Sequence, residues 1–183
     1  MSEHETETVR LRVATPHDVP ALRVLIDASV RGLSADRYTP AQIESALRHM
    51  FGVDTQLVRD RTYYVVEAEG QPVAAGGWSR RRTLFGGDQQ KDADDPLLDP
   101  AAEPARIRAF FVHPAWARRG LGRLLFETCH AAARDAGFTA LELMATLPGQ
   151  PLYATLGFVP LERVDLSLPD GLHLPCVRMR RAI

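Results

Sequence analysis

The stretch Ile107-Arg108-Ala109-Phe110-Phe111-Val112-His113-Pro114, followed closely by Arg118-Arg119-Gly120-Leu121-Gly122-Arg123, decides the fold of this chain. Residues 107–112 are rich in β-branched and aromatic side chains and predict a strand, which ends at Pro114 because proline has no N–H for a sheet ladder. After the glycines, apolar residues recur with the spacing of one helix face as far as Ala132. The stretch therefore predicts a strand, a basic loop with two glycines, and a long helix.

The first turn of this helix is suited to bind an anion. Backbone N–H groups without intrahelical partners gather at a helix start, where the helix dipole is also positive. Gly120 and Gly122 place no Cβ between the backbone and a ligand, and Arg118, Arg119 and Arg123 add positive charge. We interpret the loop as a phosphate or pyrophosphate site, with a solvated basic helix start as the alternative.

Two well-known glycine loops do not fit these residues. A Walker A loop needs a Lys-Ser/Thr pair after its last glycine, and a dinucleotide fingerprint needs a third glycine where this chain has Leu125. The order strand, His-Pro, then Arg-Arg-Gly-x-Gly resembles the acetyl-CoA pyrophosphate loop of the GNAT superfamily of N-acetyltransferases. The usual family pattern is Gln/Arg-x-x-Gly-x-Gly/Ala; Ala117 departs from its first position, and Arg118 is placed to compensate.

A second motif follows at the distance customary for that family. Residues 139–145 predict a further strand. The sequence Pro151-Leu152-Tyr153-Ala154-Thr155-Leu156-Gly157-Phe158 predicts a short helix and resembles the GNAT signature Phe/Leu-Tyr-x-x-x-Gly-Phe. The family often has Asn near the preceding strand end, where this chain has Thr146.

The resemblance implies an enzyme that transfers an acetyl group from acetyl-CoA directly to a primary amine of a small molecule or peptide. It implies that Tyr153 is the general acid that protonates the departing CoA thiolate. The cofactor-binding residues that it implies are Phe110, Phe111 and Val112 of the central strand, and Arg118, Arg119, Gly120, Leu121, Gly122 and Arg123 of the loop.

Several roles stay open. Glu67, Glu69, Glu142 and His113 are candidates for the general base, acting directly or through water. The alternative function is a non-catalytic acyl-CoA sensor, against which Tyr153 at the signature position argues, since a sensor needs no proton donor. The identity of the acceptor is open, as is a homodimer.

Composition argues against several other classes of protein. The chain has 183 residues, 45% of them hydrophobic, which is enough for one domain over residues 1–183 without disulfides or metals. Its 22 Lys and Arg residues nearly balance 23 Asp and Glu residues, so no overall field favours nucleic acid or an anionic membrane. The chain lacks a signal-peptide pattern and an apolar run near 18 residues, and we expect a cytoplasmic protein. Cys129 and Cys176 lack metal-ligand spacing, so we expect buried thiols and no metal site.

The remaining elements predict a mixed α/β domain. Their order, β-α-α-β-β-β-α-β-α-β-β, is similar to the GNAT fold, with a central mixed, mostly antiparallel sheet of about seven strands flanked by helices. The further expected strands cover residues 9–13, 62–68, 73–78, 163–168 and 172–179, and the early helices cover about 15–31, closed by Gly32, and 39–51. Gly76-Gly77 predicts a bulge or a close backbone approach.

Irregular segments complete the chain. We expect residues 1–7 to be a disordered tail and residues 83–105 to be a flexible loop near the acceptor, whose aspartates either steer a cationic amine or only solubilise the loop. Arg80 to Arg82 either grip the 3′-phosphate of the cofactor or an acidic substrate, or end a strand in solvent. Residues 34–38 either contact the substrate or form an ordinary polar turn.

Overall fold

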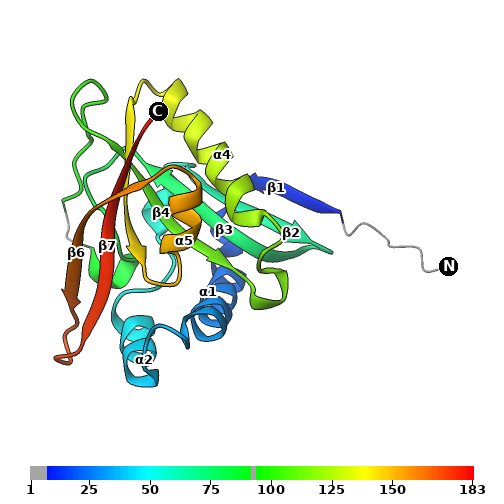
Figure 1. The fold of residues 1–183 in the computed structure, drawn as a ribbon. Coiled ribbons are helices and arrows are strands. Elements are labelled where there is room, and N and C mark those ends of the chain that lie inside the picture. Colours follow the sequence, from blue (N-terminus) through cyan, green and yellow to red (C-terminus); the bar gives the residue numbers. More distant parts are fainter. Residues whose placement is uncertain (1–7, 92–93) are drawn as a thin grey trace.

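The computed structural model describes residues 8–91 and 94–183, so the predicted tail over residues 1–7 lies outside the described residues. One seven-stranded sheet has the order β1-β2-β3-β4-β5-β7-β6 (Figure 1). The strands are β1 (Val9–Val13), β2 (Tyr63–Ala68), β3 (Gln71–Ser79), β4 (Ala105–Val112), β5 (Ala140–Thr146), β6 (Val159–Ser167) and β7 (His173–Ala182). The α-helices are α1 (Val19–Ser34), α2 (Pro40–His49), α3 (Thr55–Arg59), α4 (Leu121–Asp135) and α5 (Gln150–Thr155). Only β4 and β5 pair in parallel, through the α4 crossover, which confirms the predicted mixed, mostly antiparallel sheet.

The sheet is covered on both faces. Val65 and Ala75 belong to the apolar cluster that α1 and α2 share with the sheet, whereas their neighbours Val66 and Ala74 pack with α4. Successive strand residues point to opposite faces, so these two clusters lie on opposite sides of the sheet. The central strands β2 and β3 are therefore buried on both faces.

The early helices differ from the prediction at one end. Thr39 caps α2, accepting a hydrogen bond from Gln42 N at 3.2 Å, which confirms the predicted start. The prediction that Gly32 ends α1 is wrong, because the helix continues to Ser34. A Cβ at Gly32 would lie 2.2 Å from Cγ of Pro114, so this glycine allows the turn after β4 to lie against α1.

The sequence reading also missed α3. This helix has five residues, too few for a periodic apolar face, and it begins at the buried Asp54. Asp54 Oδ1 accepts hydrogen bonds from the N–H groups of Gln56 and Leu57, at 3.0 and 3.3 Å. The side chain that starts α3 thus lies inside the protein.

A bulge in β4 separates it from β5. Ala109 has a φ of 54°, the register against β3 shifts there, and the buried Tyr63 hydroxyl donates to the Ala109 carbonyl at 2.9 Å. A Cβ at Gly76 would lie 2.4 Å from the Phe110 ring, which confirms the predicted close approach in β3. Pairing of β4 with β5 is confined to two residue pairs, Ala105 with Leu141 and Arg106 with Glu142. Beyond these pairs the two strands diverge.

Residues 83–105 make more contacts than their composition suggests. Gly87 N donates to Met50 O at 2.8 Å, a short 3-10 turn covers Asp88–Gln90, and Leu98 is buried beside β5 and α4 residues of the core. Arg81 and Leu97 form an isolated antiparallel bridge. The described parts of this segment are held by these contacts, and its mobility without substrate stays a prediction.

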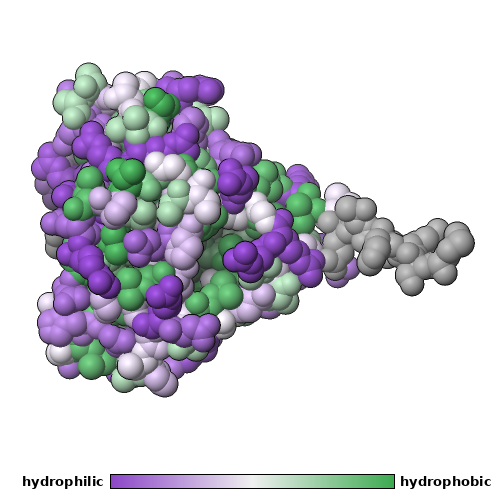
Figure 2. Space-filling model, viewed as in Figure 1, coloured by the Kyte–Doolittle hydropathy of each residue, from purple (hydrophilic) through white to green (hydrophobic). Residues whose placement is uncertain are grey.

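The outer surface is mixed in character. On the face shown in Figure 2, hydrophobic residues lie scattered among hydrophilic ones. In the described ranges, 8–91 and 94–183, no helix combines the length and apolar character needed to cross a membrane.

Candidate active site

A cleft lies where β4 and β5 diverge. Its cavity volume is about 110 Å³. Four segments contribute: the bulged part of β4, the end of β5 with the start of α5, the α2–α3 connection, and the loop after β3. The lining residues are Met50, Phe51, Gly52, Leu84, Phe85, Gly86, Gly87, Ile107, Arg108, Ala109, Phe110, Phe111, Leu143, Met144, Thr146, Gly149 and Tyr153.

The predicted phosphate loop forms the start of α4. The first intrahelical hydrogen bond runs from Leu124 N to Gly120 O at 3.0 Å, so the N–H groups of residues 121–123 precede the helical ladder. Arg118 and Gly120 have φ values of 62° and 83°, which turn the backbone sharply before the helix. The Arg119 guanidinium lies 4.6 Å from the Trp116 ring centroid. The loop has the geometry expected of an anion site.

The two glycines of this loop have different surroundings. A Cβ at Gly120 would meet no described atom within 4 Å, whereas a Cβ at Gly122 would lie 2.8 Å from Cδ2 of Leu152. Gly122 therefore allows α5 to pack against the first turn of α4. Leu121 points into the core and is 5% exposed, so only its backbone is available to a ligand.

The backbone groups of β4 differ in how available they are to a ligand. Phe110 and Val112 were both predicted to serve the cofactor through their backbone, but the Val112 N–H already donates to the buried Ser29 hydroxyl of α1 at 3.1 Å. Phe110 lies in the bulge, with its ring beside Tyr153, and Phe111 packs edge-on against Phe51 with ring centroids 6.2 Å apart. A ligand along β4 would meet the bulge at Phe110 and would have to displace Ser29 from the Val112 N–H.

Tyr153 stands at the junction of the cleft and α5. Its ring packs between Phe110 and Phe158, with centroid distances of 6.2 and 5.9 Å. Thr146 and Gly149 line the cleft next to it. Burial, with the nearby Cys129 as a smaller contribution, raises the pKa of the Tyr153 phenol. The hydroxyl therefore keeps its proton throughout the neutral range.

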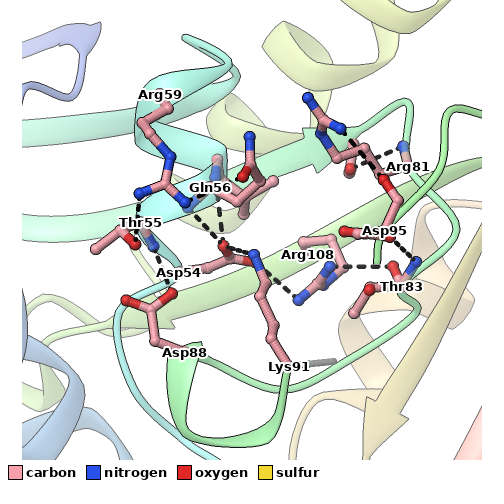
Figure 3. A network of polar contacts seen from close by, with 12 residues as sticks. Asp54, Thr55, Gln56, Arg59, Arg81, Thr83, Asp88, Lys91, Asp95 and Arg108 are labelled. Carbon is pink, nitrogen blue, oxygen red and sulfur yellow. Dashed lines mark hydrogen bonds and ion pairs between the residues drawn. The ribbon is translucent and has the colours of Figure 1, made fainter. Parts of the chain in front are cut away.

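A buried ion cluster holds the opposite wall (Figure 3). The Arg108 guanidinium donates to Asp54 Oδ2 at 2.9 Å, and Lys91 pairs with Oδ1 of the same carboxylate. Arg108 also donates to the carbonyls of Thr83 at 3.0 Å and Gly86 at 2.6 Å. Burial lowers the pKa of Arg108, and the Asp54 charge opposes that shift. The cluster joins β4, the start of α3 and both ends of residues 83–91.

None of the four candidate bases lines the cleft. Glu67 of β2 accepts a hydrogen bond from Arg12 Nε of the edge strand β1 at 3.0 Å. Glu142 pairs with Arg178 at 3.2 Å. His113 Nδ1 accepts from Ala115 N at 3.1 Å and so stabilises the turn after β4, while Glu69 lies in the β2–β3 turn. In the described part of the chain, the cleft lining contains no carboxylate and no imidazole.

Two other predicted contacts lie elsewhere. The Tyr38 hydroxyl donates to Pro175 O at 2.7 Å and accepts from Leu147 N at 2.9 Å, so Tyr38 is a buried strut and not a substrate contact. Arg80 to Arg82 follow the end of β3 that pairs with Arg106, whereas the phosphate loop adjoins the opposite end of the sheet, next to Val112. These arginines lie away from the phosphate loop, and their contact with the 3′-phosphate or an acidic substrate stays a prediction.

The loop aspartates have structural partners. Asp88 Oδ1 accepts from Thr55 N at 3.0 Å, and Asp95 Oδ1 accepts from Thr83 N at 2.8 Å. Asp88, Asp94 and Asp95 line a separate polar hollow beside α3, not the cleft, and Asp92 lies outside the described residues. The described members therefore do not line the cleft, and the steering of a cationic amine by these carboxylates stays a prediction.

The sequence did not predict the buried ion cluster of Asp54, Lys91 and Arg108. An arginine within an apolar strand, as at Arg108, is a signal that a buried carboxylate must lie nearby. That signal does not identify Asp54, which is 54 positions away. The two cysteines are free and buried, as predicted. Within residues 8–91 and 94–183, no group of three or more His, Cys, Asp or Glu side chains is placed to hold a metal ion.

Comparisons with known proteins agree with this geometry. The family model described as Acetyltransferase (GNAT) domain matches residues 59–160, more than half of the chain. This range includes β4, the phosphate loop, Tyr153 and the α5 signature. A comparison with curated proteins gave no significant match.

Solved structures show the same fold at low sequence identity. A GCN5-related N-acetyltransferase from Rhodopseudomonas palustris has a TM-score of 0.70 at 22% identity, covering 96% of each chain. The PaiA N-acetyltransferase from Thermoplasma acidophilum, solved with coenzyme A, has a TM-score of 0.66 at 13% identity, covering 96% of this chain and 99% of that chain. A GNAT family acetyltransferase from Brucella melitensis, solved with acetyl-CoA, has a TM-score of 0.56 at 17% identity, covering 97% and 89%.

Proposed function

Because this chain belongs to the GNAT acetyltransferase family, we propose that it transfers an acetyl group from acetyl-CoA to the nitrogen of a primary amine, with Tyr153 as the general acid. Acetyl-CoA is the co-substrate typical of the family, and two of the similar proteins were solved with coenzyme A or acetyl-CoA. The acceptor is a small molecule or a peptide amine.

The α4 start would hold the pyrophosphate. The N–H groups of residues 121–123, the positive end of the helix dipole and the side chains of Arg118, Arg119 and Arg123 supply donors and charge at one place. The pantetheine arm would then follow β4 into the cleft. Phe110, Phe111 and Val112 would border it, and Ser29 would release the Val112 N–H when the arm binds.

The chemical step is a direct displacement at the thioester. The amine nitrogen forms a bond to the acetyl carbon, negative charge builds on the carbonyl oxygen, and the carbon–sulfur bond then breaks. A backbone N–H near the β4 bulge would stabilise the oxyanion. Sulfur leaves with the electron pair of the broken bond and takes a proton from the Tyr153 hydroxyl, so that free CoA is a thiol.

Water is the proposed acceptor of the amine proton. The cleft lining contains no carboxylate or imidazole among the described residues, and Glu67, Glu142 and His113 have structural partners. A water chain from the cleft to bulk solvent needs no fixed base, provided that the amine reaches the cleft in its neutral form.

One observation carries the proposal: the β4 bulge borders a cleft in which Tyr153 lies beside Phe110, and α5, which carries Tyr153, packs through Leu152 against Gly122 in the first turn of α4. A sensor would need the loop but not the phenol. The raised pKa also gives the phenol the protonated form that an acid requires, and this form should persist to a pH above the ordinary tyrosine value of about 10.

The Tyr153→Phe variant tests the acid role. It keeps the ring contacts and removes the oxygen, so kcat should fall roughly 10²-fold to 10⁴-fold, while the dissociation constant for acetyl-CoA should change little. Steady-state kinetics with an accepted amine and calorimetric titration with acetyl-CoA measure the two quantities.

Tyr64→Phe is the matched control. Tyr64 is half-buried in β2 and does not line the cleft, so removal of its oxygen should leave kcat within about threefold of the parent. If Tyr153→Phe behaves like Tyr64→Phe with chemistry rate-limiting, Tyr153 is not the acid. Tight acetyl-CoA binding without turnover of any amine would favour the sensor.

A further inference from the structure

We infer that the acceptor is a compact apolar monoamine, and that a polyamine, an aminoglycoside or a peptide terminus is not the preferred substrate. This inference rests on the proposed function, because it assumes that the amine enters the β4–β5 cleft. It derives from the wall opposite Tyr153, whose residues come from the α2–α3 connection and from residues 84–87.

The wall is apolar where an acceptor side chain would lie. Met50 and Phe51 follow directly after α2, and Phe85 and Met144 of β5 pack against the same cluster. Phe51 and Phe111 form an edge-to-face pair at the bottom of this region. These side chains gain free energy by burying hydrocarbon and carry no charge that could pair with a second ammonium group.

The cleft has no charge available for a ligand. Among the described lining residues, Arg108 is the only charged one, and its guanidinium already donates to Asp54, to Thr83 O and to Gly86 O. With no carboxylate in the lining, a second ammonium group would be buried without a partner, at a large cost in free energy. The same surroundings favour the neutral form of the reacting amine, which is the nucleophile.

The cleft is also short on this side. The α2–α3 connection and the loop after β3 touch: Gly87 N donates to Met50 O at 2.8 Å, and a Cβ at Gly87 would lie 2.8 Å from the Gly52 carbonyl carbon. The cavity of about 110 Å³ is somewhat smaller than the roughly 150 Å³ apolar cavity that accommodates benzene. The acetyl end of the cofactor would take part of this space, so a compact alkyl or aryl-alkyl group suits what remains. The contact of Gly87 with Met50 and Gly52 blocks an extended chain at that point of the wall.

The first test compares acceptors with the parent protein. Acetyl-CoA binding is measured by calorimetry, and kcat/KM is then measured from CoA release with isoamylamine, phenylethylamine, putrescine, spermidine, kanamycin and trialanine. We expect isoamylamine or phenylethylamine to exceed each of the other amines by about 10-fold or more, since an unpaired buried charge opposes their binding.

The second test adds the missing charge. Met144→Glu places a carboxylate in the cleft, and Met144→Gln is its uncharged match in size. Arg178, opposite Met144 in the β5–β7 pair, is already paired with Glu142 and Glu162. The ratio of kcat/KM for putrescine to that for isoamylamine should rise about 10-fold in Met144→Glu and stay within about threefold in Met144→Gln. An unchanged ratio in a folded Met144→Glu protein would contradict the inference.

The outcomes separate the two proposals. If acetyl-CoA does not bind, the proposed function fails and the acceptor class fails with it. If acetyl-CoA binds, and putrescine, spermidine, kanamycin or trialanine is the best acceptor, the acceptor class alone is wrong. If acetyl-CoA binds and no amine is acetylated, the result favours the sensor, and both proposals fail. The comparison with the parent protein decides the class even if Met144→Glu does not fold.

Discussion

The phosphate loop at residues 117–123 and the acceptor wall at residues 83–91 both contain irregular backbone, yet they are held in different ways. The phosphate loop gets its shape from its own backbone, through the positive φ values of Arg118 and Gly120 and the start of α4. The acceptor wall gets its shape from distant side chains, since Arg108 of β4 and Asp54 before α3 hold both of its ends.

The two segments should therefore be sensitive to different substitutions. A locally shaped loop tolerates the loss of one side chain but not a change of backbone at Gly120. A wall held by a buried ion cluster should lose its defined structure when one charged side chain is removed, because the remaining charge is left without its partner. The three predictions below separate these behaviours.

The largest expected effect follows from Arg108→Met. This change leaves Asp54, which is 0% exposed, with Lys91 as its remaining cation, and it also frees the carbonyls of Thr83 and Gly86. The free energy of unfolding should fall by about 3–5 kcal/mol. Urea unfolding followed by circular dichroism measures the change.

Arg82→Met is the matched control for this variant. Arg82 is exposed and pairs with Glu103 at 4.0 Å, so its loss should cost less than about 1 kcal/mol. Equal unfolding midpoints for Arg108→Met and Arg82→Met would show that the buried cluster does not hold the wall.

A smaller effect is expected on local opening of the wall. Lys91 is the only lysine in the chain, so a lysine-specific protease has one possible site, after Lys91. The Lys91 side chain is 14% exposed and pairs with Asp54. Asp54→Asn weakens this pair, and native-state cleavage should become roughly 30-fold faster, equivalent to about 2 kcal/mol in the opening equilibrium.

The parent protein supplies the comparison for this experiment. The sequence predicts that residues 83–105 are mobile without substrate, and the ion cluster predicts slow cleavage at Lys91 itself. If the parent is cut as fast as Asp54→Asn, with both proteins folded, the segment is mobile and the cluster does not anchor it.

The smallest expected effect concerns the phosphate loop. Gly120→Val should weaken CoA binding about 10-fold, since a β-branched residue is strained at a φ of 83° and would shift the loop, and its side chain would extend into the open space beside Gly120. Arg119→Ala should weaken binding only about fivefold, because one exposed arginine contributes about 1 kcal/mol. Calorimetric titration with CoA ranks the two variants.

Gly171→Val controls for backbone strain. Gly171 has a φ of 84°, and a Cβ there also meets no described atom within 4 Å, but it lies in the β6–β7 turn. This variant should carry a similar strain with unchanged CoA affinity. If Gly120→Val also binds CoA as tightly as the parent does, the loop is not the pyrophosphate site.

Local motifs could be predicted from the sequence because the residues that form each of them lie close together in the chain. The strand that ends at Pro114, the glycine turn into α4 and the capping of α2 by Thr39 each depend on residues within a few positions. The same holds for the placement of Tyr153 on a short helix after a strand. The order of strands and helices follows from such signals, apart from the five-residue α3.

Such local patterns are sufficient to predict the fold, the family resemblance, the phosphate loop and Tyr153 as a candidate acid. Which groups meet in the cleft depends instead on contacts between distant parts of the chain. The tertiary structure gave Gly32 a packing role against Pro114, placed Tyr38 and the candidate bases outside the cleft, and joined Arg108 to Asp54 across 54 positions. The physical reason is that a buried charge demands a partner, whereas only the packing of the whole chain selects which one comes within 2.9 Å.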